Sequence, residues 1–89
     1  MAEERTLAKL IADGFVRRDH ARCVPADRWH AALARAALTL MTRGQDLKDL
    51  RVPVAWALSE AYAASSTDDE LVEMVAVMTA LSAVPPRAM

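Results

Sequence analysis

Apolar side chains recur at helical spacing over most of this chain. In the first segment, four of them follow the i, i+3, i+4, i+8 pattern of an amphipathic helix. They are Leu7, Leu10, Ile11 and Phe15. Two glutamates lie in the first turn, where the helix macrodipole favours negative charge. The pattern predicts a helix from about Glu3 to Val16, with Gly14 near its end.

A second helix is predicted from Pro25 to Arg43. Proline suits the first position of a helix, and Gly44 follows the last periodic residue. The main apolar stripe of this helix consists of Trp29, Leu33, Ala36 and Leu40. Leu38 lies nearly opposite, so a weaker second apolar face is present. Between the two helices, residues 17–24 have no clear period and fit either a short helix or a loop.

The next two elements are separated by a proline. Residues 46–51 favour a short turn of helix that ends before Pro53, because the proline ring disfavours a helical residue in front of it. A longer helix is predicted from Pro53 to about Ala64. Trp56 lies opposite the apolar stripe of this helix, so it is either a core residue or an anchor for a partner, a role in which tryptophan is enriched.

The last predicted helix, Leu71–Val84, is apolar around nearly its whole circumference. A capping box precedes it, in which Thr67 and Glu70 satisfy backbone donors at the helix start. The bulky side consists of Leu71, Met74, Met78 and Leu81, and the smooth side of Val72, Ala76, Ala80 and Ala83. A helix that is apolar all round must be covered all round, by its own chain or by a partner. We expect coverage within one chain.

Together these elements predict one all-α domain over residues 1–84, followed by a tail or linker, residues 85–89. The 89 residues allow a single core, and nineteen alanines with two glycines and four prolines favour helix over strand. We expect a compact antiparallel bundle of five to six short helices. The sequence has neither a secretory signal nor the ~20 consecutive apolar residues of a membrane span, so a cytoplasmic location is expected.

Charge is distributed unevenly along the chain, although the net charge is only −1. Residues 1–45 carry a net +3 and residues 46–89 a net −4. The basic interface candidates are Arg17, Arg18, Arg22 and Arg28, and the acidic ones are Asp68, Asp69 and Glu73. Complementary clusters of this kind suit head-to-tail pairing of two copies, or pairing with another protein. Each exposed ion pair would contribute at most ~1 kcal/mol.

One cluster has side chains suited to catalysis or metal binding. It consists of Asp19, His20, Cys23 and His30. The spacing His-x₂-Cys-x₆-His matches no standard zinc template, and a lone cysteine forms no intrachain disulfide. We interpret Cys23 as a structural thiol beside two solvated histidines. Neither an enzymatic activity nor a cofactor is predicted.

In its size, helix count and charge distribution the chain resembles the death-fold superfamily. Gly14 interrupts the first helix, the last helix is aliphatic, and the charged clusters are opposed. Within the superfamily, the chain is most similar to caspase-recruitment-like and effector-associated adaptor domains of bacterial defence systems. The resemblance implies a six-helix Greek-key bundle that recruits a second copy, or a partner, through complementary charged surfaces.

These observations predict a protein-interaction module of the adaptor or recruitment type, acting by homotypic or heterotypic assembly, with Trp56 as a candidate anchor. A small DNA-binding regulator is one alternative, since residues 46–51 and the following helix faintly suggest a helix-turn-helix. That second helix has Glu60 as its single charged residue, which disfavours nucleic acid. A structural or chaperone-like subunit, pairing through the apolar last helix, is the other alternative.

Overall fold

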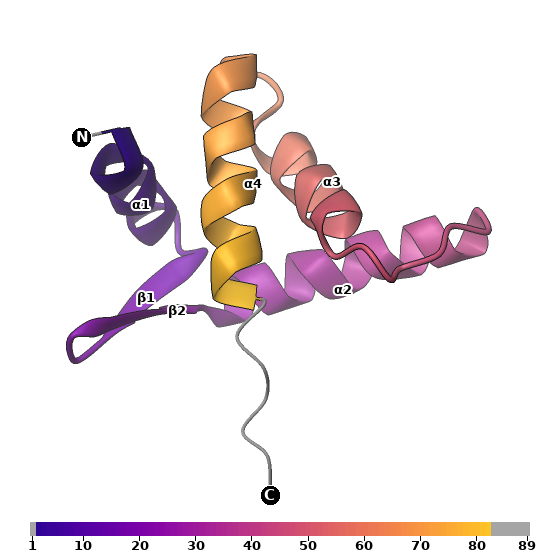
Figure 1. Ribbon diagram of the computed structural model, residues 1–89, viewed down its shortest axis with the longest axis horizontal. Helices are drawn as coiled ribbons and strands as arrows, with labels where there is room; N and C mark the ends of the chain where they lie inside the picture. Colours follow the sequence, from indigo (N-terminus) through magenta and orange to yellow (C-terminus); the bar gives the residue numbers. More distant parts are fainter. Residues whose placement is uncertain (1, 83–89) are drawn as a thin grey trace, which may run out of the picture.

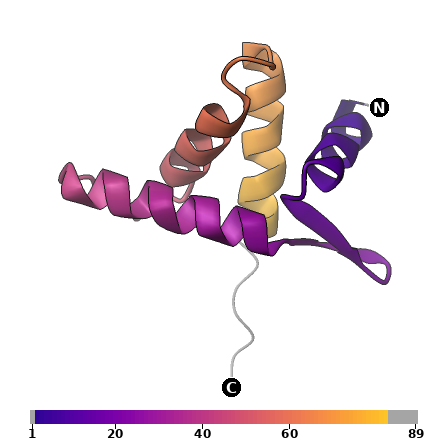
Figure 2. The ribbon, with the colours of Figure 1, turned by 180° about the vertical axis from the view of Figure 1, so that it is seen from behind.

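The computed structural model describes residues 2–82, which form four helices and one antiparallel β-hairpin. In chain order these are α1 (Ala2–Ala12), β1 (Val16–Asp19), β2 (Arg22–Pro25), α2 (Asp27–Thr42), α3 (Arg51–Tyr62) and α4 (Asp68–Ser82). Helix α4 stands at the centre, with α1 on one side and α3 on the other (Figure 1). Helix α2 crosses behind the end of α4, and the hairpin projects away from the helices (Figure 2).

The expected all-α bundle of five to six helices is therefore wrong. Residues 16–25 form a hairpin, where the sequence predicted the end of a helix and then a short helix or loop. Residues 46–50 form turns, so the short helix predicted there is also absent. The predicted end of the last helix and the tail, residues 83–89, lie outside the described residues.

A glycine cap explains why α1 stops early enough to leave a hairpin. Gly14 has a φ of +84°, a left-handed conformation that glycine adopts without strain. The Phe15 N–H donates to the Leu10 carbonyl and the Gly14 N–H to the Ile11 carbonyl, which is the Schellman pattern. The chain then turns away as β1. Its two-residue connection to β2 is made possible by His20, whose φ is +58°.

The core lies where the four helices meet the start of β1, and α1 contributes the fully buried Leu10. Trp29 is fully buried, and its Nε1 donates a hydrogen bond of 3.2 Å to Ser82 Oγ. The Phe15 ring lies edge-on to Trp29 at a centroid distance of 6.3 Å and tilted against Tyr62 at 5.7 Å. On α4, Met74 and Met78 are buried, which confirms the core side predicted for this helix. The second face of α2 is left open, since Leu38 is 63% exposed.

The capping box predicted before α4 is confirmed. The Glu70 N–H donates to Thr67 Oγ1 at 3.2 Å, and the Thr67 N–H donates to Glu70 Oε1 at 3.1 Å. These hydrogen bonds from the Thr67 backbone and hydroxyl stabilise the charged carboxylate and lower the pKa of Glu70 below its ordinary value. The reciprocal pair fixes where α4 begins, and with it the position of the two exposed aspartates in its first turn.

Removing the cap hydroxyl is expected to weaken this helix start. Thr67→Ala should lower the free energy of unfolding by ~1 kcal/mol, whereas Thr67→Ser, which keeps the hydroxyl, should stay close to wild type. Because the folded-state pKa of Glu70 is lowered, the carboxylate stabilises the fold above its ordinary pKa. This stabilisation is lost as the pH falls through the folded-state value. Urea titrations at neutral and acidic pH should show the difference between Thr67→Ala and wild type shrinking in acid; an unchanged difference would contradict this assignment.

Candidate interaction surface

The side of α4 opposite the core is exposed. Val72 is 69% exposed, and Ala76 and Ala80 are also exposed. With Asp69, which is exposed too, they follow the i, i+3, i+7, i+11 spacing of one helix face. We call these four residues the α4 face. We expected the chain itself to cover the smooth side of this helix. At Val72, Ala76 and Ala80, the positions of that side within the described residues, this expectation is wrong.

The reason lies in the arrangement of the neighbouring helices. Helices α1 and α3 flank α4, and α2 crosses behind it, so no element of residues 2–82 lies in front of the α4 face (Figures 1 and 2). Residues 17–24, which fitted either a short helix or a loop, belong to the hairpin beside α4 instead. The other three helices cover one side of α4, and nothing within residues 2–82 covers the other.

Two apolar grooves border the α4 face. The first, of about 310 Å³, lies between α4, α1 and β2. It is lined by Leu7, Cys23, Glu73, Ala76, Val77, Ala80 and Leu81. The second, shallower and of about 590 Å³, lies along α3. It is lined by Asp49, Arg51, Val52, Ala55, Trp56, Ser59 and Val75. The α4 face and its two grooves form one apolar surface.

Trp56 belongs to this surface and to the core at once. It is half-buried against the core cluster, and it lines the groove along α3. The guanidinium of Arg43 lies 4.8 Å from the centre of its ring, a cation–π contact that holds the indole in place. The indole thus lies partly against the core and partly in the wall of the groove, and its role as an anchor for a partner stays a prediction.

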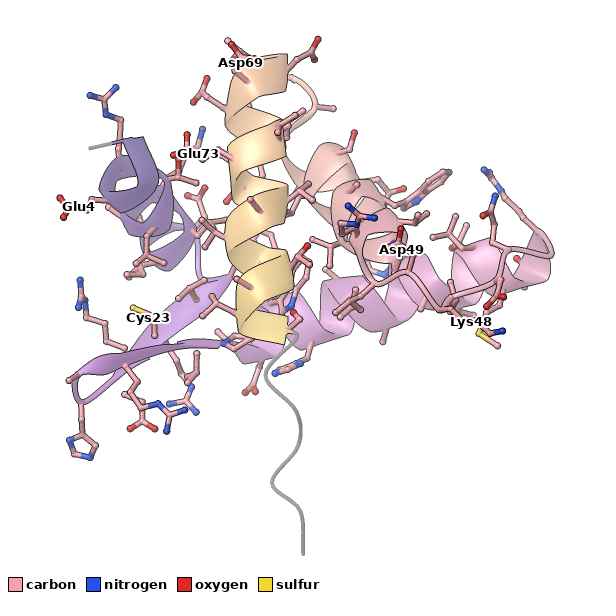
Figure 3. The ribbon with its side chains drawn as sticks, in the orientation of Figure 1. Glu4, Cys23, Lys48, Asp49, Asp69 and Glu73 are labelled. Carbon is pink, nitrogen blue, oxygen red and sulfur yellow. The ribbon has the colours of Figure 1, made fainter. Side chains whose placement is uncertain are left out.

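Three of the four arginine candidates lie together on the hairpin. In its register Arg18 pairs with Cys23, and Arg17 pairs with Val24. Because side chains alternate across a strand, Arg18 lies on the same side as Cys23, and Arg17 lies on the opposite side with Arg22. Cys23 points toward the groove beside α4 (Figure 3). Arg18 is therefore the hairpin arginine on the Cys23 side, where it lines a hollow along α1 with Leu7 and Ile11.

Arg28, the fourth basic candidate, has a structural role in the chain. Its Nη1 donates to the carbonyl oxygen of Asp13, just beyond the end of α1. Its guanidinium also lies 4.4 Å from the centre of the Phe15 ring. The basic cluster therefore consists of Arg17, Arg18 and Arg22 alone. No local sequence signal could separate Arg28 from them, because its role depends on a ring thirteen positions away.

The acidic candidates lie in the first two turns of α4, at the end of the helix away from the hairpin. Asp68 and Asp69 are exposed in its first turn, whereas Glu73 is half-buried and turned toward α1 (Figure 3). Glu73 lines a hollow with Arg5 and Lys9 of α1, in which the Lys9 ammonium lies 4.0 Å from the Glu70 carboxylate. Within residues 4–82, no ion pair of up to 4.0 Å joins either aspartate or any of the three hairpin arginines to an opposite charge.

The candidate metal ligands are not brought together. Asp19 and His20 lie at the hairpin tip, Cys23 faces the groove, and His30 is exposed on α2. Among the described residues, no group of three or more histidine, cysteine, aspartate or glutamate side chains is arranged to hold a metal ion.

The chain matches no protein-family model, no curated protein and no solved structure. None of the helices in residues 2–82 has the length and apolar character needed to cross a membrane. The function is therefore inferred from the surface around α4.

Proposed function

We propose that this chain is a protein-interaction module that binds through the α4 face and its two grooves. The observation that carries the proposal is the exposed apolar face on a helix whose other side forms the core. Contiguous apolar patches with polar margins mark protein-binding sites. The half-buried Trp56 in the adjoining groove adds the type of residue that anchors such contacts.

The charges around this surface favour a protein over nucleic acid. Arginines lie at one end of α4 and aspartates at the other, so an extended polyphosphate backbone would be attracted at one end and repelled at the other. The helix-turn-helix alternative required a helix at residues 46–51, and residues 46–50 form turns. A protein partner can carry negative charge opposite the arginines and positive charge opposite the aspartates, so it can be attracted at both ends of α4.

Site-specific photo-crosslinking in the cells that make the protein tests this proposal. A photoreactive phenylalanine analogue at position 72, in the middle of the α4 face, should form an adduct with a protein on irradiation. The matched control is the same analogue at position 34, an exposed alanine on α2, which should give a much weaker adduct. Equal adduct yields at the two positions, or none at position 72, would contradict binding through the α4 face.

The composition of the adduct also separates the two protein-binding alternatives. An adaptor that assembles with itself or with related domains gives adducts of the chain with such domains. A structural or chaperone-like subunit gives one adduct, with a single larger protein, in all growth conditions.

A further inference from the structure

We infer that the α4 face is covered by a second copy of the chain, with the two α4 helices packed antiparallel about a two-fold axis. The inference rests on the proposed function and names the partner. It follows from three properties of the surface: the sizes of the side chains along the α4 face, the opposite charges at its ends, and the position of the hairpin.

The side chains of the α4 face complement those of an inverted copy. Ala76 lies midway between Val72 and Ala80. When two such helices pack antiparallel with Ala76 on the two-fold axis, Val72 of each copy meets Ala80 of the other. A larger side chain then faces a smaller one on both sides of the axis, which is how facing apolar layers interdigitate. The small central residue lets the two helices approach closely.

The charges select the antiparallel orientation over the parallel one. The aspartates occupy the first turn of α4, and the hairpin contacts the last turns, near Leu81, through Cys23. The positions of Asp69 and Ala80 are separated by about 16 Å along the helix. Parallel packing would place aspartates against aspartates at one end, and both hairpins at the other end, away from the aspartates. Antiparallel packing brings the aspartates of each copy to the end of the partner that carries the arginines.

The position of the hairpin is also compatible with this pairing. The hairpin and α1 lie on the same side of α4 (Figure 1). A two-fold axis that is perpendicular to α4 and lies in the plane of the α4 face reverses the direction of the helix. It leaves the hairpin and α1 of the second copy on the same side of α4 as in the first. The hairpin of the second copy therefore comes over the first turn of α4 on the α1 side, where Asp69 is located, whereas Glu4 lies farther out on the side of α1 away from α4 (Figure 3). Arg18, on the Cys23 side of the hairpin, is the arginine best placed to reach Asp69.

Disulfide trapping of the purified full chain tests the orientation and the register. The background is Cys23→Ser, so that each variant has one cysteine. Under mild oxidation Ala76→Cys should form a covalent dimer, because the two positions meet at the axis. Ala80→Cys alone should form little, whereas a mixture of Val72→Cys with Ala80→Cys should form a mixed dimer. If Ala80→Cys dimerises as readily as Ala76→Cys, the packing is parallel and the inference is overturned.

Charge exchange tests the pairing of the two ends. Asp69→Arg and Arg18→Glu should each weaken self-association by about tenfold, because each creates like-charge contacts at two symmetric places. The two changes in one chain should restore most of the affinity, since the partners then carry exchanged charges. Arg17→Glu, on the opposite side of the same hairpin, is the matched control and should have a smaller effect. A double variant as weak as the single variants would overturn the charge pairing.

These results are distinguishable from a failure of the proposed function. If photo-crosslinking at position 72 gives adducts only with a different protein, and Ala76→Cys forms no covalent dimer, the α4 face binds protein but not its own copy. The inference then fails while the proposed function stands. If position 72 gives no adduct with any protein, the proposed function fails as well.

Discussion

Replacing Trp29 with alanine is expected to lower the free energy of unfolding by about 3–5 kcal/mol. The indole is fully buried and contacts the Phe15 ring edge-on. Its Nε1 also joins the start of α2 to the end of α4 through Ser82. Truncation therefore leaves a large cavity at the junction of the core and removes that hydrogen bond. A domain of this size is stable by only ~4–13 kcal/mol, so this loss removes a large part of its total stability.

Urea denaturation followed by far-ultraviolet circular dichroism measures this effect. Trp56→Ala is the matched control, because this indole is only half-buried and its groove is open to solvent. It should cost clearly less stability than Trp29→Ala. A larger loss for Trp56→Ala would mean that the centre of the core lies elsewhere, on the α3 side of the molecule.

Replacing Ala76 with arginine is expected to abolish self-association, weakening it by at least about a hundredfold. On the two-fold axis, two long side chains with like charge would meet where two methyl groups allowed close packing. Like charges placed opposite each other, together with steric exclusion of the central contact, oppose dimer formation strongly. The isolated fold should be unaffected, since Ala76 is exposed and arginine is a good helix former.

Sedimentation velocity and circular dichroism together measure this outcome. The matched control is Ala34→Arg, which adds the same side chain at an exposed position of α2. The control should associate like the wild type. An Ala76→Arg chain that keeps both its helix content and its self-association would show that the α4 face is not the contact.

The sequence predicted most of the helices because their signals are local. The stripe that contains Trp29 and the capping box at Thr67 each depend on residues within a few turns of one another. The hairpin was missed because its strands hold three arginines and few β-branched residues, a composition with little strand propensity. It forms because Gly14 ends α1 in a left-handed conformation and because its inner side packs beside α4.

The candidate surface was only partly predictable. The hairpin arginines and the aspartates were noted from charge alone, and the structure places the hairpin beside the last turns of α4 and the aspartates in its first turn. The grooves were not, because Leu7, Val52 and Val75 line them through contacts between helices that are distant in the sequence. A helix that is apolar on both sides signals that something covers it. Whether the chain itself provides this cover depends on how many other helices it has to pack around α4.

The death-fold resemblance stays a prediction. The six helices it implied are not found, since four helices and a hairpin make up the described residues. The resemblance and the present proposal have assembly through complementary charges in common. That common element depends only on the exposed arginines and aspartates.

The most direct test of the account is the mass of the unmodified chain in solution. Multi-angle light scattering at low ionic strength should give twice the 9.7 kDa chain mass at high protein concentration. Dilution should return the mass of one chain, and added salt should favour the monomer because exposed ion pairs are screened. A mass of one chain at every concentration and ionic strength would contradict the pairing of two copies through α4.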